Sequence, residues 1–163
     1  MSYIYDTFPT PHGPFSVALD DNDAVVAACF GDLARLRKSA PAGDLVRDAR
    51  RTATVRRELG EYFAGRRSAF SVKTAARGTP FQQRAWAALR AIPFGETRSY
   101  GGLAAQLGNA NASRAIGRAN ATNPVCVIVP CHRVIGADGS LTGFAYGEPL
   151  KRKLLEHEGA LRR

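Results

Sequence analysis

Short runs of apolar residues, separated by turn-forming residues, open the chain. The runs are Tyr3–Phe8, Phe15–Leu19 and Ala24–Phe30, and the segments between them are rich in Pro, Gly, Asp and Asn. This pattern is typical of consecutive antiparallel strands. We therefore predict a small antiparallel sheet at the start of the chain.

A helical pattern follows the predicted strands. Val55, Leu59, Tyr62 and Phe63 fall on one face of a helix, and a glycine suited to a helix end follows at position 65. We predict a helix over Val46–Ala64. Its arginines are most simply a solvated face; they are Arg47, Arg50, Arg51, Arg56 and Arg57.

The second half of the chain begins with a helix-start signal. Thr79-Pro80-Phe81-Gln82 combines an N-cap threonine, a proline at the first helical position and a glutamine three residues after the cap. The apolar face of this helix continues to Pro93. Residues 73–78 have no strong pattern and are interpreted as a linker. We predict an N-terminal α/β domain over 1–74 and a C-terminal domain over 79–163.

Two short helices then form a candidate helix–turn–helix. Ser99 can cap the first, which ends at Gly108, and the second runs from about Ala112 to Thr122. The second helix is rich in small residues and carries Arg114 and Arg118. A slim, basic helix can approach a DNA groove closely. Close packing against another helix is the alternative explanation for its small residues.

The charge of the chain favours a polyanionic partner. Its 163 residues include 23 Lys and Arg against 14 Asp and Glu, a net charge of +9. Residues 79–163 carry 11 basic and 5 acidic side chains, whereas residues 1–78 carry 12 and 9. Nucleic acid is the simplest partner for such a surface, and the C-terminal half is the better candidate for phosphate contacts. An incidentally basic protein is the alternative.

Targeting signals are not apparent. No window approaches the roughly 18 apolar residues of a membrane span. The N-terminus has neither a basic start nor an apolar segment of the kind that secretory signals contain. We expect a cytoplasmic protein without membrane association.

The three cysteines differ in their surroundings. Their odd number and the lack of CxxC spacing argue against a disulfide framework and a four-cysteine zinc site. Cys29 and Cys126 lie inside apolar runs and are interpreted as inert. Cys131 follows the apolar run Val125–Val129, which predicts a buried strand, and it precedes a histidine that could promote thiolate formation.

Pro130-Cys131-His132-Arg133-Val134 resembles the active-site motif of the O6-alkylguanine-DNA alkyltransferases, the methylated-DNA–protein-cysteine methyltransferases. The resemblance covers Thr79–Ala160 and is weak before it. Its further motifs occur in the family's order and spacing: Phe81-Gln82, Pro93-Phe94-Gly95-Glu96, Ser99-Tyr100, Arg114-Ala115-Ile116-Gly117, Asn123-Pro124, Thr142-Gly143 and His157-Glu158-Gly159.

The resemblance implies roles for individual residues. Cys131 matches the nucleophile that accepts the alkyl group, His132 the base that reaches it through a water, and Glu158 the carboxylate that orients the histidine. Asn123 matches the residue that fixes the active-site turn. Tyr100 matches the tyrosine that assists base rotation and donates its hydroxyl to the guanine ring.

The same resemblance implies a DNA-binding surface and an alkyl pocket. Arg114 matches the arginine that takes the place of the flipped base, and Arg118 and Ser113 lie on the same helix. The expected pocket is formed by Val134, Phe144, Ala145 and Tyr146. Taken alone, each residue has a simpler interpretation: a phosphate contact or solvated face for Arg114, a packing residue for Tyr100 and an exposed charge for Glu158. Only the joint pattern favours the functional roles.

The implied protein is an α/β (α+β) fold. It has a small N-terminal antiparallel sheet plus helix domain, followed by a mostly helical C-terminal domain with a winged-helix-like helix–turn–helix. It would flip O6-alkylguanine, and also O4-alkylthymine, out of double-stranded DNA and transfer the alkyl group irreversibly to Cys131 in a single turnover. The resemblance implies a monomer able to cluster along DNA. Some members of the family carry zinc in the N-terminal domain, but here Cys29 has no cysteine partner there and His12 alone is not enough, so we expect no metal. No cofactor motif occurs, so we expect no cofactor.

Three alternatives and two departures from the family pattern bear on this interpretation. A non-catalytic alkylguanine-binding relative would lack Cys131. A helix–turn–helix transcription factor would not need Pro130–Val134 or Glu158. A cysteine hydrolase would need an oxyanion hole, for which there is no signature. The family often has Tyr where this chain has Phe144, and small residues where it has Tyr146, so the size of alkyl group that fits is left open.

Overall fold

The computed structural model describes residues 1–161 as two compact units. The first contains Met1–Arg77 together with Pro124–Ile128, and the second contains Gly78–Asn123 and the described chain from Val129 onward. The predicted boundary at 74–79 lies close to this division, but residues 124–128 fall in the first unit. That the two halves are separate domains stays a prediction.

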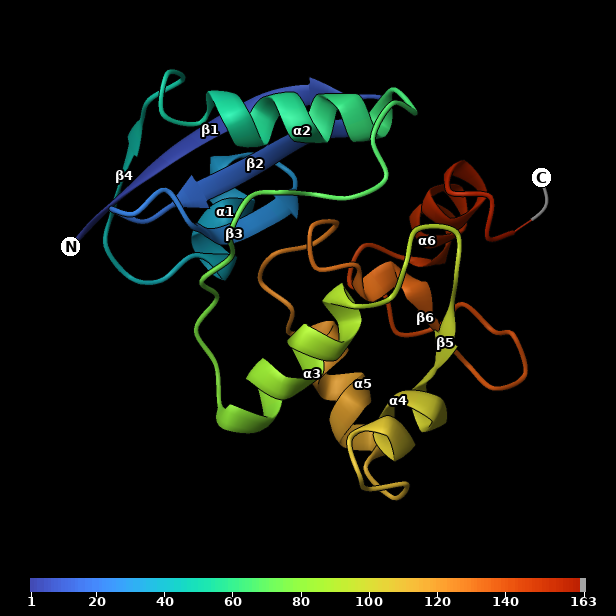
Figure 1. Cartoon of the computed structure of the whole chain (residues 1–163). Coiled ribbons are helices and arrows are strands. Elements are labelled where there is room, and N and C mark those ends of the chain that lie inside the picture. Colours follow the sequence, from blue (N-terminus) through green and yellow to red (C-terminus); the bar gives the residue numbers. More distant parts are fainter. Residues whose placement is uncertain (162–163) are drawn as a thin grey trace. The chain divides into compact units, whose positions relative to one another are not determined.

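The first unit is built on a four-stranded sheet in the order β3-β2-β1-β4 (Figure 1). Its strands are β1 Ser2–Thr10, β2 Gly13–Leu19, β3 Val25–Phe30 and β4 Asp44–Arg47. The first three are consecutive and antiparallel, as the apolar runs predicted. Strand β4 pairs in parallel with β1 and was not expected.

The predicted helix over Val46–Ala64 begins later than expected. Helix α2 spans Ala53–Phe63, because the preceding chain pairs with the sheet as β4 and then turns. The carboxylate of Asp48 accepts the backbone N–H groups of Arg50 and Arg51, which stabilises that turn rather than a helix. The prediction of helix at Val46 was therefore wrong, whereas the end of the helix before Gly65 is confirmed.

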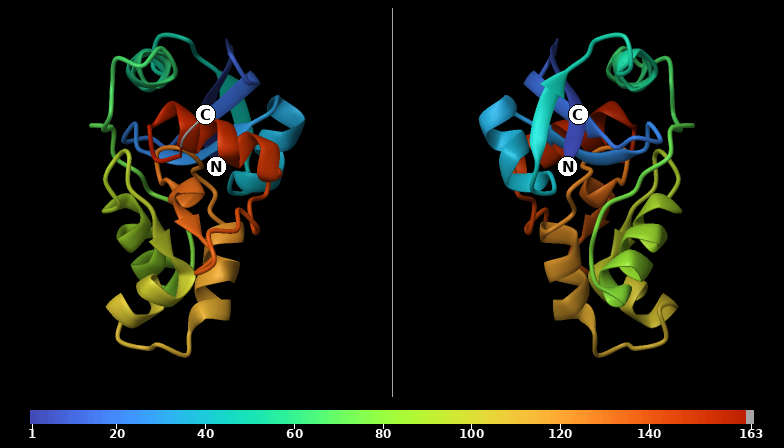
Figure 2. Two further views of the ribbon diagram at one scale, coloured as in Figure 1. Left: turned by 90° about the vertical axis from the view of Figure 1, so that its right-hand side faces the viewer. Right: turned by 90° about the vertical axis from the view of Figure 1, so that its left-hand side faces the viewer.

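Two helices pack on this sheet, and α2 contributes Phe63 to an aromatic cluster with Phe15 and Phe30. Helix α1, Leu33–Ser39, contacts β3 and β2, and α2 contacts β1; Figures 1 and 2 show α2 running along the sheet. Phe15, Phe30 and Phe63 meet edge to face with ring centroids 5.0–6.1 Å apart. Such geometry adds to the burial of apolar area.

Two of the arginines expected on a solvated face bind a buried carboxylate. Asp6 is buried, and its carboxylate accepts hydrogen bonds from Arg47 at 3.0 Å and Arg56 at 3.1 Å. Buried carboxylates need such partners, because an unpaired buried charge is costly. These side chains thus tie β4 and α2 to β1.

Strand β3 is an outer strand of the sheet, and its outer edge pairs with segments from elsewhere in the chain. Val25 exchanges backbone hydrogen bonds with Lys73 and Ala75, so the predicted linker over 73–78 begins as part of the first unit. Ala28 bonds in the same way to Pro124 and Cys126. Covering an edge strand satisfies backbone groups that would otherwise invite pairing with another chain.

The continuous strand predicted over Val125–Val129 is not formed. The residues are buried as expected, but only isolated bridges occur, and a tight turn centred on Val127 interrupts them. Val127 has a φ of 72°, and Ile128 N–H donates to the Cys126 carbonyl at 2.9 Å. A positive φ is strained for a β-branched residue and persists only where surrounding contacts enforce it.

The second unit is mostly helical. Its elements are α3 Pro80–Arg90, β5 Arg98–Ser99, α4 Tyr100–Gln106, α5 Ser113–Ala121, the 3-10 helix η1 Cys131–Arg133, β6 Val134–Ile135 and α6 Glu148–His157. The capping box at Thr79 and the serine cap at Ser99 are confirmed. Figures 1 and 2 show α4 and α5 side by side, joined by the turn that the sequence predicted.

Helix α5 is anchored on α3 by two side chains. The Trp86 indole N–H donates to the Ala119 carbonyl at 2.8 Å, and Gln82 donates to the Thr122 hydroxyl at 3.2 Å. The mixed α/β fold class with a helical C-terminal part is thus confirmed. None of the helices in residues 1–161 is long and apolar enough to cross a membrane.

Candidate active site

The backbone around Cys131 is held by Asn123. The Asn123 amide donates to the Val129 carbonyl at 2.8 Å, two residues before the cysteine, and Cys131 N–H donates to the same carbonyl. Cys131 then begins the short helix η1 and is 5% exposed. The thiol is therefore fixed in place at the end of a tightly turned, buried segment.

A buried carboxylate binds the two residues that follow the cysteine. The Glu158 carboxylate lies 2.7 Å from His132 Nε2 and accepts two hydrogen bonds from Arg133, from Nε at 2.8 Å and from the guanidinium at 3.0 Å. Arg133 also donates to the Ile92 carbonyl at 2.6 Å. The side chains of His132, Arg133 and Glu158 are all buried, so each depends on the others for its hydrogen bonds.

The histidine is arranged to accept a proton at Nδ1. Burial lowers the pKa of His132, against the opposing effect of Glu158, so the ring is neutral at physiological pH. With a carboxylate at Nε2, that nitrogen carries the proton and Nδ1 carries the lone pair. Nδ1 is buried and has no hydrogen-bond partner among the described residues.

The pKa of the Cys131 thiol reflects opposing influences. Burial raises this pKa, whereas the Asn123 side chain and the Lys151 ammonium lower it. At rest the group is a thiol, and a base is needed to generate the nucleophilic thiolate. The site thus combines a poised base with two groups that favour the thiolate once it forms.

Lys151 is a buried cation beside this cysteine. Its Nζ donates to the Val134 carbonyl at 2.5 Å and to the Thr142 carbonyl at 3.1 Å, and lies 5.9 Å from the centre of the Tyr100 ring. Burial lowers the pKa of Lys151 to about 8, although Cys131 raises it. The lysine therefore holds two backbone segments around the thiol while supplying positive charge.

Tyr100 lies close to Cys131 and lines a hollow beside α5. Its hydroxyl donates to the Thr142 carbonyl at 3.0 Å, and the proximity of Cys131 contributes to raising its pKa, after the larger effect of burial. The hollow has a volume of about 620 Å³. It is lined by Tyr100, Ser113, Arg114, Gly117, Arg118, Ala121, Thr142 and Gly143.

The shape of this hollow depends on a glycine. Gly143 has a φ of +81°, and a Cβ placed there would lie 2.6 Å from the Tyr100 hydroxyl. The expected pocket loop therefore contributes Thr142 and Gly143 to the lining. Phe144 and Tyr146 are half-buried and pack on each other at 5.5 Å, next to the exposed Ala145, and their role as an alkyl-pocket wall stays a prediction.

Several proteins of named families are similar to this chain in sequence and in fold. Residues 80–160 match the family described as 6-O-methylguanine DNA methyltransferase, DNA binding domain. The methylated-DNA–protein-cysteine methyltransferase of Methanosarcina acetivorans is 56% identical over 104 residues, which are 64% of this chain and 67% of that protein. The Mycobacterium tuberculosis H37Rv protein of the same name is 57% identical over 101 residues, 62% of this chain and 61% of that protein.

A solved structure extends the likeness to both units. The crystal structure of Mycobacterium tuberculosis OGT in complex with DNA matches with a TM-score of 0.86 at 40% identity, covering 98% of this chain and 94% of that one. The chain belongs to the O6-methylguanine-DNA methyltransferase family. The family member from Pyrococcus kodakaraensis matches with a TM-score of 0.61 at 26% identity, covering 96% of this chain and 99% of that one.

Family membership confirms the resemblance expected from Thr79–Ala160 and identifies the chain as a DNA-binding methyltransferase of the DNA-repair class. The structure brings together most of the predicted site. Glu158 binds His132, which follows Cys131 in the chain, and Asn123 supports the turn before the cysteine. Tyr100 lies close enough to Cys131 for the thiol to affect its pKa, and it lines the hollow beside α5.

Three buried polar residues in the second unit of the methyltransferase were not assigned roles from sequence. They are Arg133, Lys151 and Asn120. A signal was present for Lys151, because it shares one helical face with Leu154, Leu155 and Glu158, at spacings of three, four and seven residues. A lysine on the apolar stripe of a helix is unusual and indicates a buried partner.

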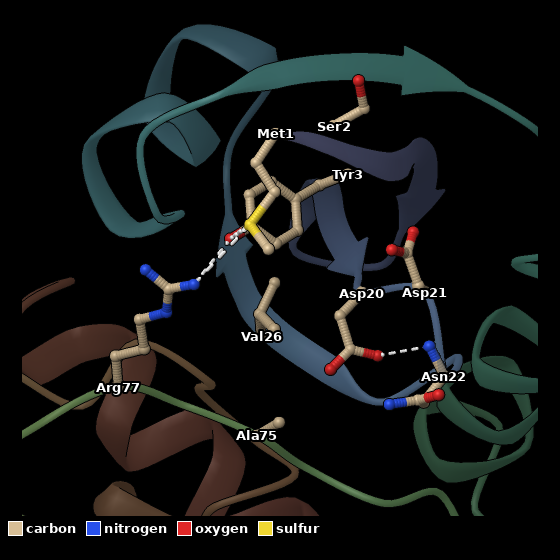
Figure 3. Close-up of a pocket in the computed structure, with 9 residues that line it drawn as sticks. All are labelled: Met1, Ser2, Tyr3, Asp20, Asp21, Asn22, Val26, Ala75 and Arg77. Atoms are coloured by element: carbon tan, nitrogen blue, oxygen red, sulfur yellow. Dashed lines mark hydrogen bonds between the residues drawn. The ribbon is translucent and has the colours of Figure 1, made fainter.

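The first unit of the methyltransferase contains a separate hollow of about 320 Å³ (Figure 3). The Asp20 carboxylate on its wall accepts the Asn22 N–H at 2.9 Å, and Arg77 on another wall donates to the Tyr3 hydroxyl at 3.1 Å. No cysteine lines it.

In the same unit, burial raises the pKa of Cys29 to about 11, so this thiol is not poised to react.

A search of the described chain finds no group of three or more His, Cys, Asp or Glu side chains placed to hold a metal ion. That the methyltransferase works without a metal or a cofactor stays a prediction.

Proposed function

We propose that this protein repairs DNA by transferring the alkyl group of O6-alkylguanine irreversibly to Cys131, once per chain. The observation that carries the proposal is the placement of a buried thiol beside a neutral, carboxylate-bound histidine, next to a hollow on a basic helix. Family membership supports the reaction class.

In the proposed reaction His132 accepts the thiol proton at Nδ1 through a bridging water, and Glu158 stabilises the resulting imidazolium. The Cys131 sulfur forms a bond to the alkyl carbon while the bond from that carbon to O6 breaks. The electron pair goes to the guanine, and Tyr100 donates a proton to the purine ring. Stabilising charge where it develops in this way lowers the barrier.

DNA contacts are assigned to α5 in this proposal. The reactive carbon of a stacked base is unreachable, so the nucleotide is extruded from the duplex at a cost of a few kcal/mol. Arg114 is exposed on the rim of the hollow and fills the space that the base leaves, while Arg118 and Ser113 bind the backbone. The DNA complex of the Mycobacterium tuberculosis relative supports duplex DNA as the partner.

The proposal includes finer points taken from the family resemblance. O4-alkylthymine is a second substrate, because its alkyl group is likewise carried on an exocyclic oxygen. The protein acts as a monomer that can cluster along DNA, in the cytoplasm. Val134, Phe144, Ala145 and Tyr146 limit the size of the alkyl group.

The stoichiometry of repair tests the proposed function. S-alkylcysteine is a thioether, and neither His132 nor Glu158 can break its bond to saturated carbon. Incubation with an excess of an O6-methylguanine duplex should therefore repair about one equivalent and then stop, with the mass of one methyl substitution confined to the Cys131 peptide. Intact-mass and peptide-mass measurements check this. A plateau well above one equivalent would refute the single-turnover reaction.

Arg114→Ala should slow repair of duplex DNA more than reaction with free O6-benzylguanine. The free base needs no extrusion, so a side chain that fills the vacated stack cannot help it. We expect the duplex reaction to slow roughly 10- to 100-fold, since extrusion costs a few kcal/mol and each 1.4 kcal/mol is a factor of ten. Single-turnover rates on the two substrates measure the difference.

Arg118→Ala, one helical turn further along, is the matched control. If Arg118 neutralises a phosphate, its loss should weaken binding to matched and lesion-containing duplexes alike and reduce the log–log salt slope by about 0.9. Equal slowing of the free-base and duplex reactions in Arg114→Ala would instead place Arg114 in the chemistry or in the fold.

A further inference from the structure

Asn120 lies on the pocket side of α5. It is one helical turn after Gly117 and two turns after Ser113, both of which line the hollow, and the next residue, Ala121, lines it as well. The side chain is 3% exposed. Asn120 therefore lies beneath the surface that the exposed arginines of the same helix present to solvent.

The amide of Asn120 is buried without a completed hydrogen bond. Neither Oδ1 nor Nδ2 has a partner of good geometry among the described residues. An unsatisfied buried amide destabilises a fold, and an apolar side chain of similar size would avoid that loss. Positions that break a packing rule in this way are characteristic of functional sites.

The Asn120 amide interacts with the Tyr100 hydroxyl. Burial and Cys131 raise the pKa of Tyr100, and Asn120 acts against both by lowering it, as a hydrogen-bond donor to the phenolate does. At rest the hydroxyl proton is directed to the Thr142 carbonyl, and the ring faces Lys151. Asn120 is thus placed to act when that proton leaves.

We propose that Asn120 is a positioning residue for Tyr100: its Nδ2 donates a hydrogen bond to the phenolate oxygen that forms when Tyr100 protonates the departing guanine. This inference rests on the proposed function and assigns a residue that the family motif did not. It explains why an amide is kept at a buried position that an apolar residue could fill.

The proton and electron pairs of this step balance. The Cys131 sulfur–carbon bond forms as the carbon–O6 bond breaks, leaving the electron pair on the guanine. The Tyr100 O–H bond breaks, its proton goes to a nitrogen of the purine ring, and its electron pair stays on the phenolate oxygen, where Asn120 donates. After the base leaves, the phenolate recovers a proton from water.

A double-mutant cycle tests this assignment. Asn120→Met, which is apolar and of similar length, should slow single-turnover repair of an O6-methylguanine duplex by about 10- to 100-fold at saturating protein, as expected for one hydrogen bond to a charged group. In a Tyr100→Phe background the same substitution should have no further effect, because the phenolate is absent. Asn111→Met, at an exposed asparagine in the preceding turn, is the matched control and should leave the rate unchanged.

A spectroscopic titration separates this inference from the proposed function. The phenolate absorbance that disappears in Tyr100→Phe belongs to Tyr100, and its pKa should rise in Asn120→Met while the melting temperature stays equal or rises. Asn120→Ala provides a second variant if Asn120→Met does not fold. If the unmodified protein transfers no methyl group, the proposed function fails, but the titration still tests Asn120. Equal slowing in both backgrounds, or an unchanged Tyr100 pKa, would overturn the assignment.

Discussion

Cys131→Ser should abolish alkyl transfer while leaving DNA affinity unchanged. A serine hydroxyl is almost wholly un-ionised near neutral pH and is a weaker nucleophile than a thiolate, even with His132 in place, so we expect the rate to fall at least about 10³-fold. Helix α5 and its charges are untouched by the substitution. Single-turnover repair of an O6-methylguanine duplex, with a parallel binding measurement, checks both expectations.

Cys126→Ala is the matched control for this experiment. Cys126 lies five residues earlier in the same buried segment, and its backbone N–H bonds to Ala28 regardless of the side chain. The variant should transfer alkyl groups at the reference rate. Methyl transfer by Cys131→Ser, or a methyl group recovered on Cys29 or Cys126, would disprove the assignment of the nucleophile.

Glu158→Gln should impair both stability and transfer. Glu158 is the shared partner of His132 and Arg133, and losing its charge leaves a buried guanidinium unpaired. Breaking a buried pair in this way costs about 3 kcal/mol or more, or roughly 6–12 °C in melting temperature for a chain of this size. With His132 no longer held as a base, the transfer rate should fall by about 10²–10⁴-fold.

The pH dependence of stability gives a further check on Glu158. Burial by itself would raise its pKa, but the hydrogen bonds from His132 and Arg133 hold the pKa well below its usual range. A carboxyl with a lowered folded-state pKa stabilises the fold above its unfolded value, about 4.3, and loses that contribution as the pH falls. The free energies of unfolding of the unmodified protein and of Glu158→Gln, measured with urea, should therefore differ at pH 7 and become similar in acid.

Glu156→Gln serves as the comparison in these measurements, because Glu156 lies on the same helix and is only half-buried. Its effect on stability should stay within about 0.5 kcal/mol, as is usual for substitutions away from buried networks. A Glu158→Gln variant as stable and as active as Glu156→Gln would remove Glu158 from the proposed relay.

The elements that were predicted correctly depend on signals between residues close together in the sequence. The capping box at Thr79, the serine cap at Ser99 and the apolar spacing of α3 act over three or four residues, so they are legible in sequence and are confirmed. The three antiparallel strands follow for the same reason, since each pair is joined by a short turn. The motifs over Thr79–Ala160 identified the family, because their residue types are rare in combination.

Contacts between distant segments decided the rest. Strand β4 forms because β1, some forty residues earlier, offers an unpaired edge, and no spacing within 44–47 records that. The turn at Val127 replaces the predicted strand because Ala28 bonds Pro124 and Cys126 on one side while Asn123 holds Val129 on the other. A residue-by-residue pattern shows that a segment is apolar, but not what partners its backbone.

The sequence by itself determined the helix–turn–helix and the basic helix α5, since these depend on residue type and short spacing. The roles of Cys131, His132 and Glu158 came from the joint pattern over Thr79–Ala160 and stay predictions. Only the tertiary structure decided that Arg133 shares Glu158 with His132, that Lys151 binds two carbonyls beside the thiol, and that the Asn120 amide is buried without a hydrogen-bond partner of good geometry among the described residues. The physical reason is that a buried polar side chain is costly without partners, and the partners of Arg133 and Lys151 come from elements far apart in the chain.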